Sequence, residues 1–216
     1  KGDLKTQNYN MQIDMNKGNG KSPLGDLGVL GKIFERKKEE VALAKQQVSV
    51  KELENNPVFN RTPYRFKDFL LAADRTGIIA EFKKQSPSKG VINGNADVKA
   101  ITQAYNAAGA SALSVLTDTD FFGGKKEDLL QARSVNEIPI LRKDFMVDEY
   151  QILEAKAWGA DIILLIASIL TPQQIADYGK FAQSLGLNVL LEVHDLAELE
   201  RSICAHLDAI GVNNRN

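Results

Sequence analysis

The sequence predicts an α/β protein with parallel strands. Short apolar runs alternate with amphipathic helical stretches from Gly77 onward. Successive runs begin roughly 20 to 35 residues apart, which is the size of one strand–helix unit in a parallel sheet. The composition, with 44% hydrophobic and 25% charged residues, is that of an ordinary globular chain. These observations favour one large domain or two small ones built from repeated units.

Composition and charge argue against several function classes. The net charge of -1 at pH 7 gives no electrostatic basis for binding nucleic acid. No apolar run reaches the roughly 18 residues that a membrane-spanning helix needs, and we expect no signal peptide because the first residues are polar. The single cysteine, Cys204, excludes an internal disulfide and a multi-cysteine metal site, and it fits a reducing compartment.

Two segments precede the repeating units. Residues 1–25 are polar and rich in Asn, Gly and Lys, and we interpret them as a flexible tail or the remnant of an upstream segment. Residues 26–76 are expected to form a helical extension, with apolar residues at helical spacing over 30–44 and a second short helix over 65–73. The charged run over 35–40 is interpreted as the solvent-exposed face of the first helix.

The repeating part, residues 77–216, contains six apolar runs that predict strands. These runs cover 78–82, 112–116, 138–141, 162–166, 189–191 and 209–212. The helical stretches between them cover 98–108, 126–134, 149–158, 172–185 and 196–206. Gly109, Gly159 and Gly186 each follow such a stretch, where a left-handed C-cap favours glycine. Six strands alternating with helices leave two architectures, an open doubly wound sheet and a (β/α)8 barrel.

Polar side chains at the strand ends favour the barrel. Side chains alternate across a strand, so residues two apart share a face. The residues concerned are Glu81 and Lys83 on the first strand, Lys143 on the third, Glu192 on the fifth and Asn213 on the sixth. A barrel would direct all of them into the mouth at its C-terminal end, where barrel enzymes carry out their chemistry. A neighbouring Lys and Glu can supply a general acid and a general base.

Two of the loops that follow strands suit a ligand. The loop over 83–90 combines lysines, serines and a glycine, which suits an anionic ligand and a mobile flap. The loop with Phe121 and Phe122 offers either packing against the barrel or an aromatic wall for a planar substrate. His194 is interpreted as a strand-end residue without a role, and Trp158 and Cys204 as packing residues.

Five motifs, in order along the chain, resemble the signatures of the indole-3-glycerol-phosphate synthase family. They are IAEFKKQSPSKG at 79–90, LTD at 116–118 with FFGG at 121–124, LRKDF at 141–145 with DEYQ at 148–151, LEVHD at 191–195, and IGVNNRN at 210–216. Five such motifs in order are highly specific. The resemblance extends from Leu30 to the last residue, and residues 1–25 lie outside it.

The resemblance implies a (β/α)8 barrel with an N-terminal helical extension. It also implies an enzyme that closes the indole ring of 1-(2-carboxyphenylamino)-1-deoxyribulose 5-phosphate, with loss of carbon dioxide and water, in tryptophan biosynthesis. Neither a cofactor nor a metal is implied. We expect a cytoplasmic enzyme with a small phosphorylated substrate and no nucleic-acid or membrane partner. Fusion to, or association with, another domain of the pathway is compatible with this expectation.

The resemblance further implies roles for single residues. Lys143 resembles the general acid that protonates the leaving oxygen, and Glu192 resembles the acid–base partner in dehydration. Glu81 and Lys83 resemble the catalytic pair of the first strand, where the lysine also contacts the substrate. The implied substrate-binding and network positions are Ser86, Phe122, Phe145, Asn213 and Arg215. The two phenylalanines of this set resemble the apolar walls around the anthranilate ring.

The motifs correspond to six of the eight strands of such a barrel. We therefore interpret the chain as a piece of a longer reading frame, roughly 50 to 60 residues short of closure and without the loops that usually bind phosphate. Alone, it is expected to fold poorly, to self-associate through open edge strands and to be nearly inactive. The alternative is a non-catalytic barrel fragment that acts only in folding or assembly. A sister phosphate-binding barrel is disfavoured by the Lys143 and Glu192 motifs.

Overall fold

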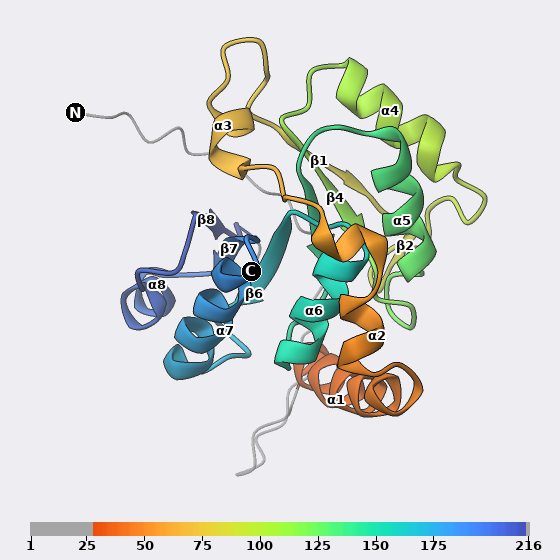
Figure 1. The fold of residues 1–216 in the computed structure, drawn as a ribbon. Coiled ribbons are helices and arrows are strands. Elements are labelled where there is room, and N and C mark those ends of the chain that lie inside the picture. Colours follow the sequence, from red (N-terminus) through yellow and green to blue (C-terminus); the bar gives the residue numbers. More distant parts are fainter. Residues whose placement is uncertain (1–27, 215–216) are drawn as a thin grey trace.

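The computed structural model of the chain describes residues 28–214 and contains a curled sheet of six parallel strands (Figure 1). Across the sheet these are β1 (Ile79–Phe82), β4 (Ala112–Leu116), β5 (Ile140–Lys143), β6 (Ile162–Ile166), β7 (Asn188–Val193) and β8 (Ala209–Val212). Their order follows the sequence without reversal, as in a barrel and unlike a doubly wound sheet. The predicted α/β class is confirmed, and the sheet is that of an incomplete (β/α)8 barrel. The tail predicted over residues 1–25 lies outside the described residues.

One helix connects each strand of this sheet to the next. These helices are α4 (Val98–Ala107), α5 (Lys126–Val135), α6 (Glu149–Ala157), α7 (Pro172–Ser184) and α8 (Leu196–Ser202). The N-terminal extension contains α1 (Val29–Gln47), α2 (Val50–Glu54), the 3-10 helix η1 (Pro57–Asn60) and α3 (Phe66–Leu70). Between residues 28 and 214, no helix has the length and apolar character needed to cross a membrane.

Capping residues determine where several helices begin. The Thr171 side chain accepts a hydrogen bond from the backbone N–H of Gln174, whose own side chain accepts one from the backbone of Thr171, which forms a capping box. The carboxylates of Asp97, Asp148 and Asp195 cap α4, α6 and α8 in a similar way. Each of these polar residues directly precedes its helix, so the start of the helix is encoded locally.

The three glycines predicted to end helices adopt the expected backbone conformation. Gly109, Gly159 and Gly186 have φ values of 89°, 86° and 78°, a region that residues with a Cβ atom rarely adopt. At Gly159 an added Cβ would also lie 2.7 Å from the side chain of Arg133. The chain can therefore turn back toward the sheet at these points.

The observed structure differs most from the predicted helices and strands where the elements are short. Helix α3 has five residues where the sequence predicts a helix over 65–73, and α8 ends at Ser202 rather than at 206. Helices α2 and η1 were not predicted, nor was the hairpin of β2 (Gln85–Ser86) and β3 (Gly90–Val91) within the loop after β1. Elements of two to five residues are too short to show the repeating hydrophobic pattern from which helices and strands are predicted.

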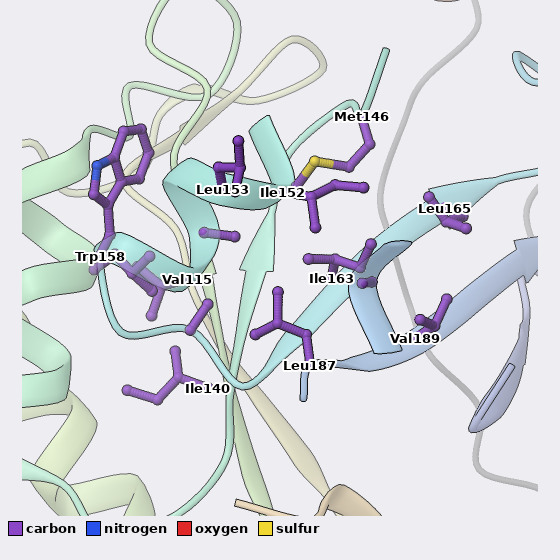
Figure 2. Packing of buried hydrophobic residues seen from close by; sticks show 14 of the residues in the cluster. Val115, Ile140, Met146, Ile152, Leu153, Trp158, Ile163, Leu165, Leu187 and Val189 are labelled. Atoms are coloured by element: carbon purple, nitrogen blue, oxygen red, sulfur yellow. The ribbon is translucent and has the colours of Figure 1, made fainter. Parts of the chain in front are cut away.

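The apolar residues form two clusters, one on each face of the sheet. Side chains on the outer face pack against the helices, as Figure 2 shows for Ile163 beside Ile152 of α6. Trp158 lies in this outer cluster, which confirms its interpretation as a packing residue. The inner cluster fills the concave side of the sheet, and it includes side chains from α1 and α3 as well as from the strands.

The prediction that the whole charged run of α1 faces solvent is wrong. Glu35, Arg36, Lys38 and Glu39 are exposed, but Lys37 is only 3% exposed. Lys37 lies four residues after Ile33 and four before Val41, both of which are buried. It therefore occupies the buried stripe of the helix, and its charge has to be compensated inside the protein.

Asp161 attaches the N-terminal extension to the bottom of the sheet. Its carboxylate is fully buried and accepts hydrogen bonds from Arg61 (2.6 Å), from Arg133 (2.9 Å) and from the backbone N–H of Tyr64 (2.7 Å) and Ile140 (2.8 Å). One side chain thereby joins the segment before α3, helix α5 and the start of β5. The position precedes β6 by one residue, and no sequence pattern marked it.

Replacing Asp161 by alanine is expected to destabilise the fold strongly. The change leaves the Arg133 guanidinium, which is largely buried, without its carboxylate partner, and breaking a buried pair in this way costs roughly 3 to 5 kcal/mol. Urea unfolding measures the loss. Asp177→Ala, on the exposed face of α7, is the control and should change the unfolding free energy by less than about 0.5 kcal/mol. Equal effects of the two changes would contradict this role for Asp161.

Candidate active site

A cavity opens at the C-terminal ends of the strands. Its lining residues come from four strands and the loops that follow them: Glu81, Lys83, Leu116, Phe122, Lys143, Asp144, Phe145, Leu164 and Ile166. Polar side chains from β1 and β5 thus face apolar ones from β4 and β6. The C-terminal end of the strands is where barrel enzymes place their active sites.

Lys143 and Glu192 form a buried ion pair in the barrel interior. The Nζ atom of Lys143 lies 3.3 Å from Oε2 of Glu192, and the two residues are 2% and 3% exposed. The side-chain amide of Asn213 donates a hydrogen bond to Oε1 of Glu192 at 3.1 Å. Lys143 is on β5 and Glu192 is on β7, so the ion pair connects two strands that are separated by β6. The structure thus brings together three of the residues predicted from three different strands.

Glu81 and Lys83 form a second pair, on β1 and the residue after it. The Nζ atom of Lys83 donates to Oε1 of Glu81 at 2.8 Å, and both side chains are partly exposed to the cavity. The neighbouring Lys84 points to the opposite side, where it pairs with Asp128 of α5 at 2.7 Å. As the sequence predicted, neighbouring side chains alternate here: Lys83 lines the cavity, whereas Lys84 pairs with a helix on the outer side of the sheet.

Phe122 and Phe145 form one wall of the cavity. Their ring centroids are 6.1 Å apart with an interplanar angle of 36°, and both residues are almost fully buried. Phe122 both packs in the inner apolar cluster and lines the cavity, so the two roles that the sequence left open for the loop after β4 do not exclude each other at this residue. Aromatic faces beside cationic and acidic groups suit a planar ligand that carries polar substituents.

The remaining predicted residues lie elsewhere. Ser86 is buried within the β2–β3 hairpin, where its Oγ accepts a hydrogen bond from the backbone N–H of Lys89 at 3.2 Å and lies 3.3 Å from Oγ of Ser88. It does not line the cavity as the described residues form it. Arg215 lies outside the described residues. His194, predicted to have no role, lies 3.2 Å from Glu198 of α8.

Asp118 and Asp144 are site residues that the residue pattern did not reveal. Each follows a strand, and each contacts the Nζ atom of Lys37, at 2.8 Å and 3.0 Å respectively. Asp144 also accepts hydrogen bonds from Thr117 at 2.7 Å and from Arg142 at 3.1 Å. The available signal was the position of Lys37 within an apolar helical stripe, which implies a buried partner of opposite charge.

Electrostatics keep Lys37 and Asp144 ionised. Burial by itself raises the pKa of Asp144, but the charges of Lys37 and Arg142 and the hydroxyl of Thr117 outweigh burial and hold the pKa at about 2. Burial likewise opposes the charged form of Lys37, yet Asp144 and Asp118 raise its pKa above the ordinary value. Both groups are therefore charged at any physiological pH.

Comparison with known proteins places the chain among enzymes of one kind. The family model described as indole-3-glycerol phosphate synthase matches residues 30–216. The indole-3-glycerol phosphate synthase of Bacteroides thetaiotaomicron is 47% identical over 189 residues, which cover 87% of this chain and 72% of the relative. That of Laribacter hongkongensis is 46% identical over 191 residues, which cover 87% of this chain and 73% of the relative.

Solved structures give a weaker likeness. The carboxyl transferase domain of Rhizobium etli pyruvate carboxylase aligns with a TM-score of 0.44 and 15% identity, over 62% of this chain and 27% of that one. A similarity at this level carries no argument about function.

Acidification is expected to expose the contribution of Asp144 to stability. Its pKa of about 2 in the folded chain lies below the ordinary aspartate value of 3.8, so its stabilising effect is present above pH 4 and is lost as the pH falls toward 2. The full loss, reached below pH 2, amounts to roughly 2 kcal/mol, of which about half has occurred at pH 3. Urea unfolding at pH 5, 4 and 3 measures it, with Asp144→Asn as the comparison. An equal pH dependence in the two proteins would contradict the assignment.

Proposed function

The chain belongs to the indole-3-glycerol phosphate synthase family, and on that premise we propose that the cavity at the strand ends is where its substrate reacts. The enzyme is a carboxy-lyase of tryptophan biosynthesis. It converts 1-(2-carboxyphenylamino)-1-deoxyribulose 5-phosphate into indole-3-glycerol phosphate, carbon dioxide and water. The observation that carries the proposal is the buried Lys143, which reaches both the aromatic wall and Glu192.

The reaction needs a general acid, an acid–base group for the dehydration step, and a rigid surface that binds the ring. The ring carbon that bears the carboxylate attacks the ketone carbon of the sugar chain, and the ketone oxygen has to gain a proton. Carbon dioxide then leaves the ring carbon, which restores aromaticity in the benzene ring. Finally the new hydroxyl departs as water after it receives a proton, while a proton is lost from the forming pyrrole ring. No redox partner is needed for this balance.

We assign the first proton transfer to Lys143. Its side chain lines the cavity with Phe145, and its ammonium group lies 3.3 Å from the carboxylate of Glu192. A cation placed at the ketone oxygen both donates a proton and stabilises the negative charge that develops during attack. The β5 backbone and the packing of residues around it hold the group in place, as efficient proton transfer requires.

Glu192 is the proposed acid–base group of the dehydration step. One of its oxygens contacts Lys143, and the other accepts a hydrogen bond from Asn213. This arrangement fixes the plane of the carboxylate. Glu192 and Asn213 line a separate pocket, and Lys143 connects this carboxylate to the cavity. Asn213 therefore serves, in our proposal, to orient Glu192 as well as to bind substrate.

The pair of Glu81 and Lys83 lines the same cavity, and β1 is separated from β5 by β4 alone. We propose that Lys83 contacts the substrate while Glu81 holds its ammonium at 2.8 Å. Both groups are partly exposed to the cavity, so each can exchange its present partner for a ligand atom. Two lysines that line one cavity, Lys83 after β1 and Lys143 on β5, suit a substrate with both a carboxylate and a phosphate.

The aromatic wall is the proposed seat of the anthranilate ring. Phe122 and Phe145, with Leu164 and Ile166, give this part of the cavity an apolar surface. A ring held against them keeps its reacting carbon at a fixed distance from the ketone, which lowers the entropic cost of closing the new ring. We further propose that Ser86 and Arg215 contribute to substrate binding from the loops after β1 and β8.

In a protein extended to the full length of its relatives, replacing Lys143 by alanine is expected to abolish most of the turnover. Loss of a proton donor that acts in the transition state should lower kcat by about 10²- to 10⁴-fold, with a smaller change in KM. Glu192→Gln should have a comparable effect. Formation of indole-3-glycerol phosphate, followed by its fluorescence, provides the measurement.

His194→Ala is the control for this pair of variants. His194 follows Glu192 by two residues and contacts Glu198 rather than the cavity residues, so its replacement should leave kcat nearly unchanged. Near-normal turnover in either the Lys143 or the Glu192 variant would contradict the proposed roles.

A further inference from the structure

Lys37 lies outside the barrel wall and yet contacts two residues at the mouth of the cavity. Its Nζ atom lies 2.7 Å from Glu40 on the same helix, 2.8 Å from Asp118 after β4 and 3.0 Å from Asp144 after β5. The Lys37 side chain is 4% exposed, and the two aspartates are 0% and 2% exposed. One ammonium group therefore neutralises carboxylates on two neighbouring loops.

The same two carboxylates also hold the backbone of the aromatic wall. Oδ1 of Asp118 accepts hydrogen bonds from the backbone N–H of Phe121 at 2.8 Å and of Phe122 at 3.2 Å. Oδ1 of Asp144 accepts one from the backbone N–H of Phe145 at 2.9 Å. Each half of the wall is thus connected to Lys37 through a single side chain.

We propose that Lys37 is a positioning residue that sets the separation of Phe122 and Phe145 and thereby the fit of the substrate ring. This inference rests on the proposed function, because it takes the wall to be the seat of the ring. Without the ammonium group, two buried carboxylates on adjacent loops would face each other without their shared cation. Repulsion between them would move the loops apart, and the two rings would follow.

Other contacts attach α1 to the barrel, so the role proposed for Lys37 is distinct from attachment of the helix. Lys45 pairs with Asp148 at 2.7 Å, and the hydroxyl of Tyr150 donates to the backbone of Val48 at 2.7 Å. Ile33 is fully buried in the same cluster as the two phenylalanines. These contacts hold α1 on the barrel at both ends, so a change at Lys37 alters the wall before it releases the helix.

The test compares Lys37→Met with Lys45→Met. Both changes remove a lysine of α1 that pairs with an aspartate of the barrel, but Asp148 holds no part of the wall. We expect Lys37→Met to raise KM roughly tenfold or more with a smaller change in kcat, because a displaced wall weakens binding in ground and transition states alike. Lys45→Met should leave both parameters within about twofold. Equal effects of the two changes, or an unchanged KM in Lys37→Met, would overturn the proposal.

A double variant keeps the test decisive if Lys37→Met folds poorly. Lys37→Met with Asp118→Asn removes one of the two facing charges but retains an oxygen that can accept from the N–H groups of Phe121 and Phe122. It should fold, and its KM should lie between those of the wild type and Lys37→Met, or above wild type where the single variant cannot be measured. A KM in the double variant that is no lower than that of Lys37→Met would overturn the proposal, because removal of one carboxylate charge relieves the repulsion; where Lys37→Met cannot be measured, the separation of the two rings decides.

A crystal structure of either variant tests the proposal without an activity measurement. In Lys37→Met, or in the double variant, the separation of the Phe122 and Phe145 centroids should differ from 6.1 Å. An unchanged separation would overturn the inference about Lys37. If the wild-type protein, extended to the full length of its relatives, formed no indole-3-glycerol phosphate, that result would instead contradict the proposed function, so the two failures are distinguishable.

Discussion

Each strand of the sheet presents one row of side chains to the helices and the other to the barrel interior, and both the core and the site depend on this division. In β7, Leu191 and Val193 belong to the outer cluster, whereas Leu190 belongs to the inner one and Glu192 carries the charge into the interior. A shift of one residue in the pairing of β7 would exchange these roles. The observed register, with Glu192 opposite Ile166 and Gly211, is therefore a condition for both stability and chemistry.

Charges in the interior follow a second constraint, because each has to be compensated where water cannot reach it. At the bottom of the sheet, Asp161 is paired with two arginines, and at the mouth Lys143 is paired with Glu192. Behind the mouth, Lys37 joins the loops after β4 and β5. Buried pairs add little net stability compared with apolar packing. Their value here lies in fixing loops and charged groups relative to one another, and the site uses that geometry.

The sequence predicted what depends on local periodicity and missed what depends on distant contacts. The six strands and the shared face of Glu81 and Lys83 follow from alternation along the chain, and the motifs marked Lys143 and Phe122. Lys37 was assigned to the solvent-exposed face because its partners lie about a hundred residues away in the sequence, and no local pattern identifies them. Asp161 was missed for the same reason. Helix α2 and the β2–β3 hairpin were missed because they are shorter than the period that would reveal them.

The central claim is that Lys143 delivers a proton to the ketone oxygen of a substrate whose ring rests on Phe122 and Phe145. A crystal structure with a substrate analogue in which the ketone is reduced to an alcohol tests it most directly. We predict that the alcohol oxygen lies within about 2.6 to 3.2 Å of Nζ of Lys143, which is hydrogen-bond reach, and that the ring contacts both phenylalanines. An alcohol oxygen directed away from Lys143, with the ring outside the aromatic wall, would contradict the account.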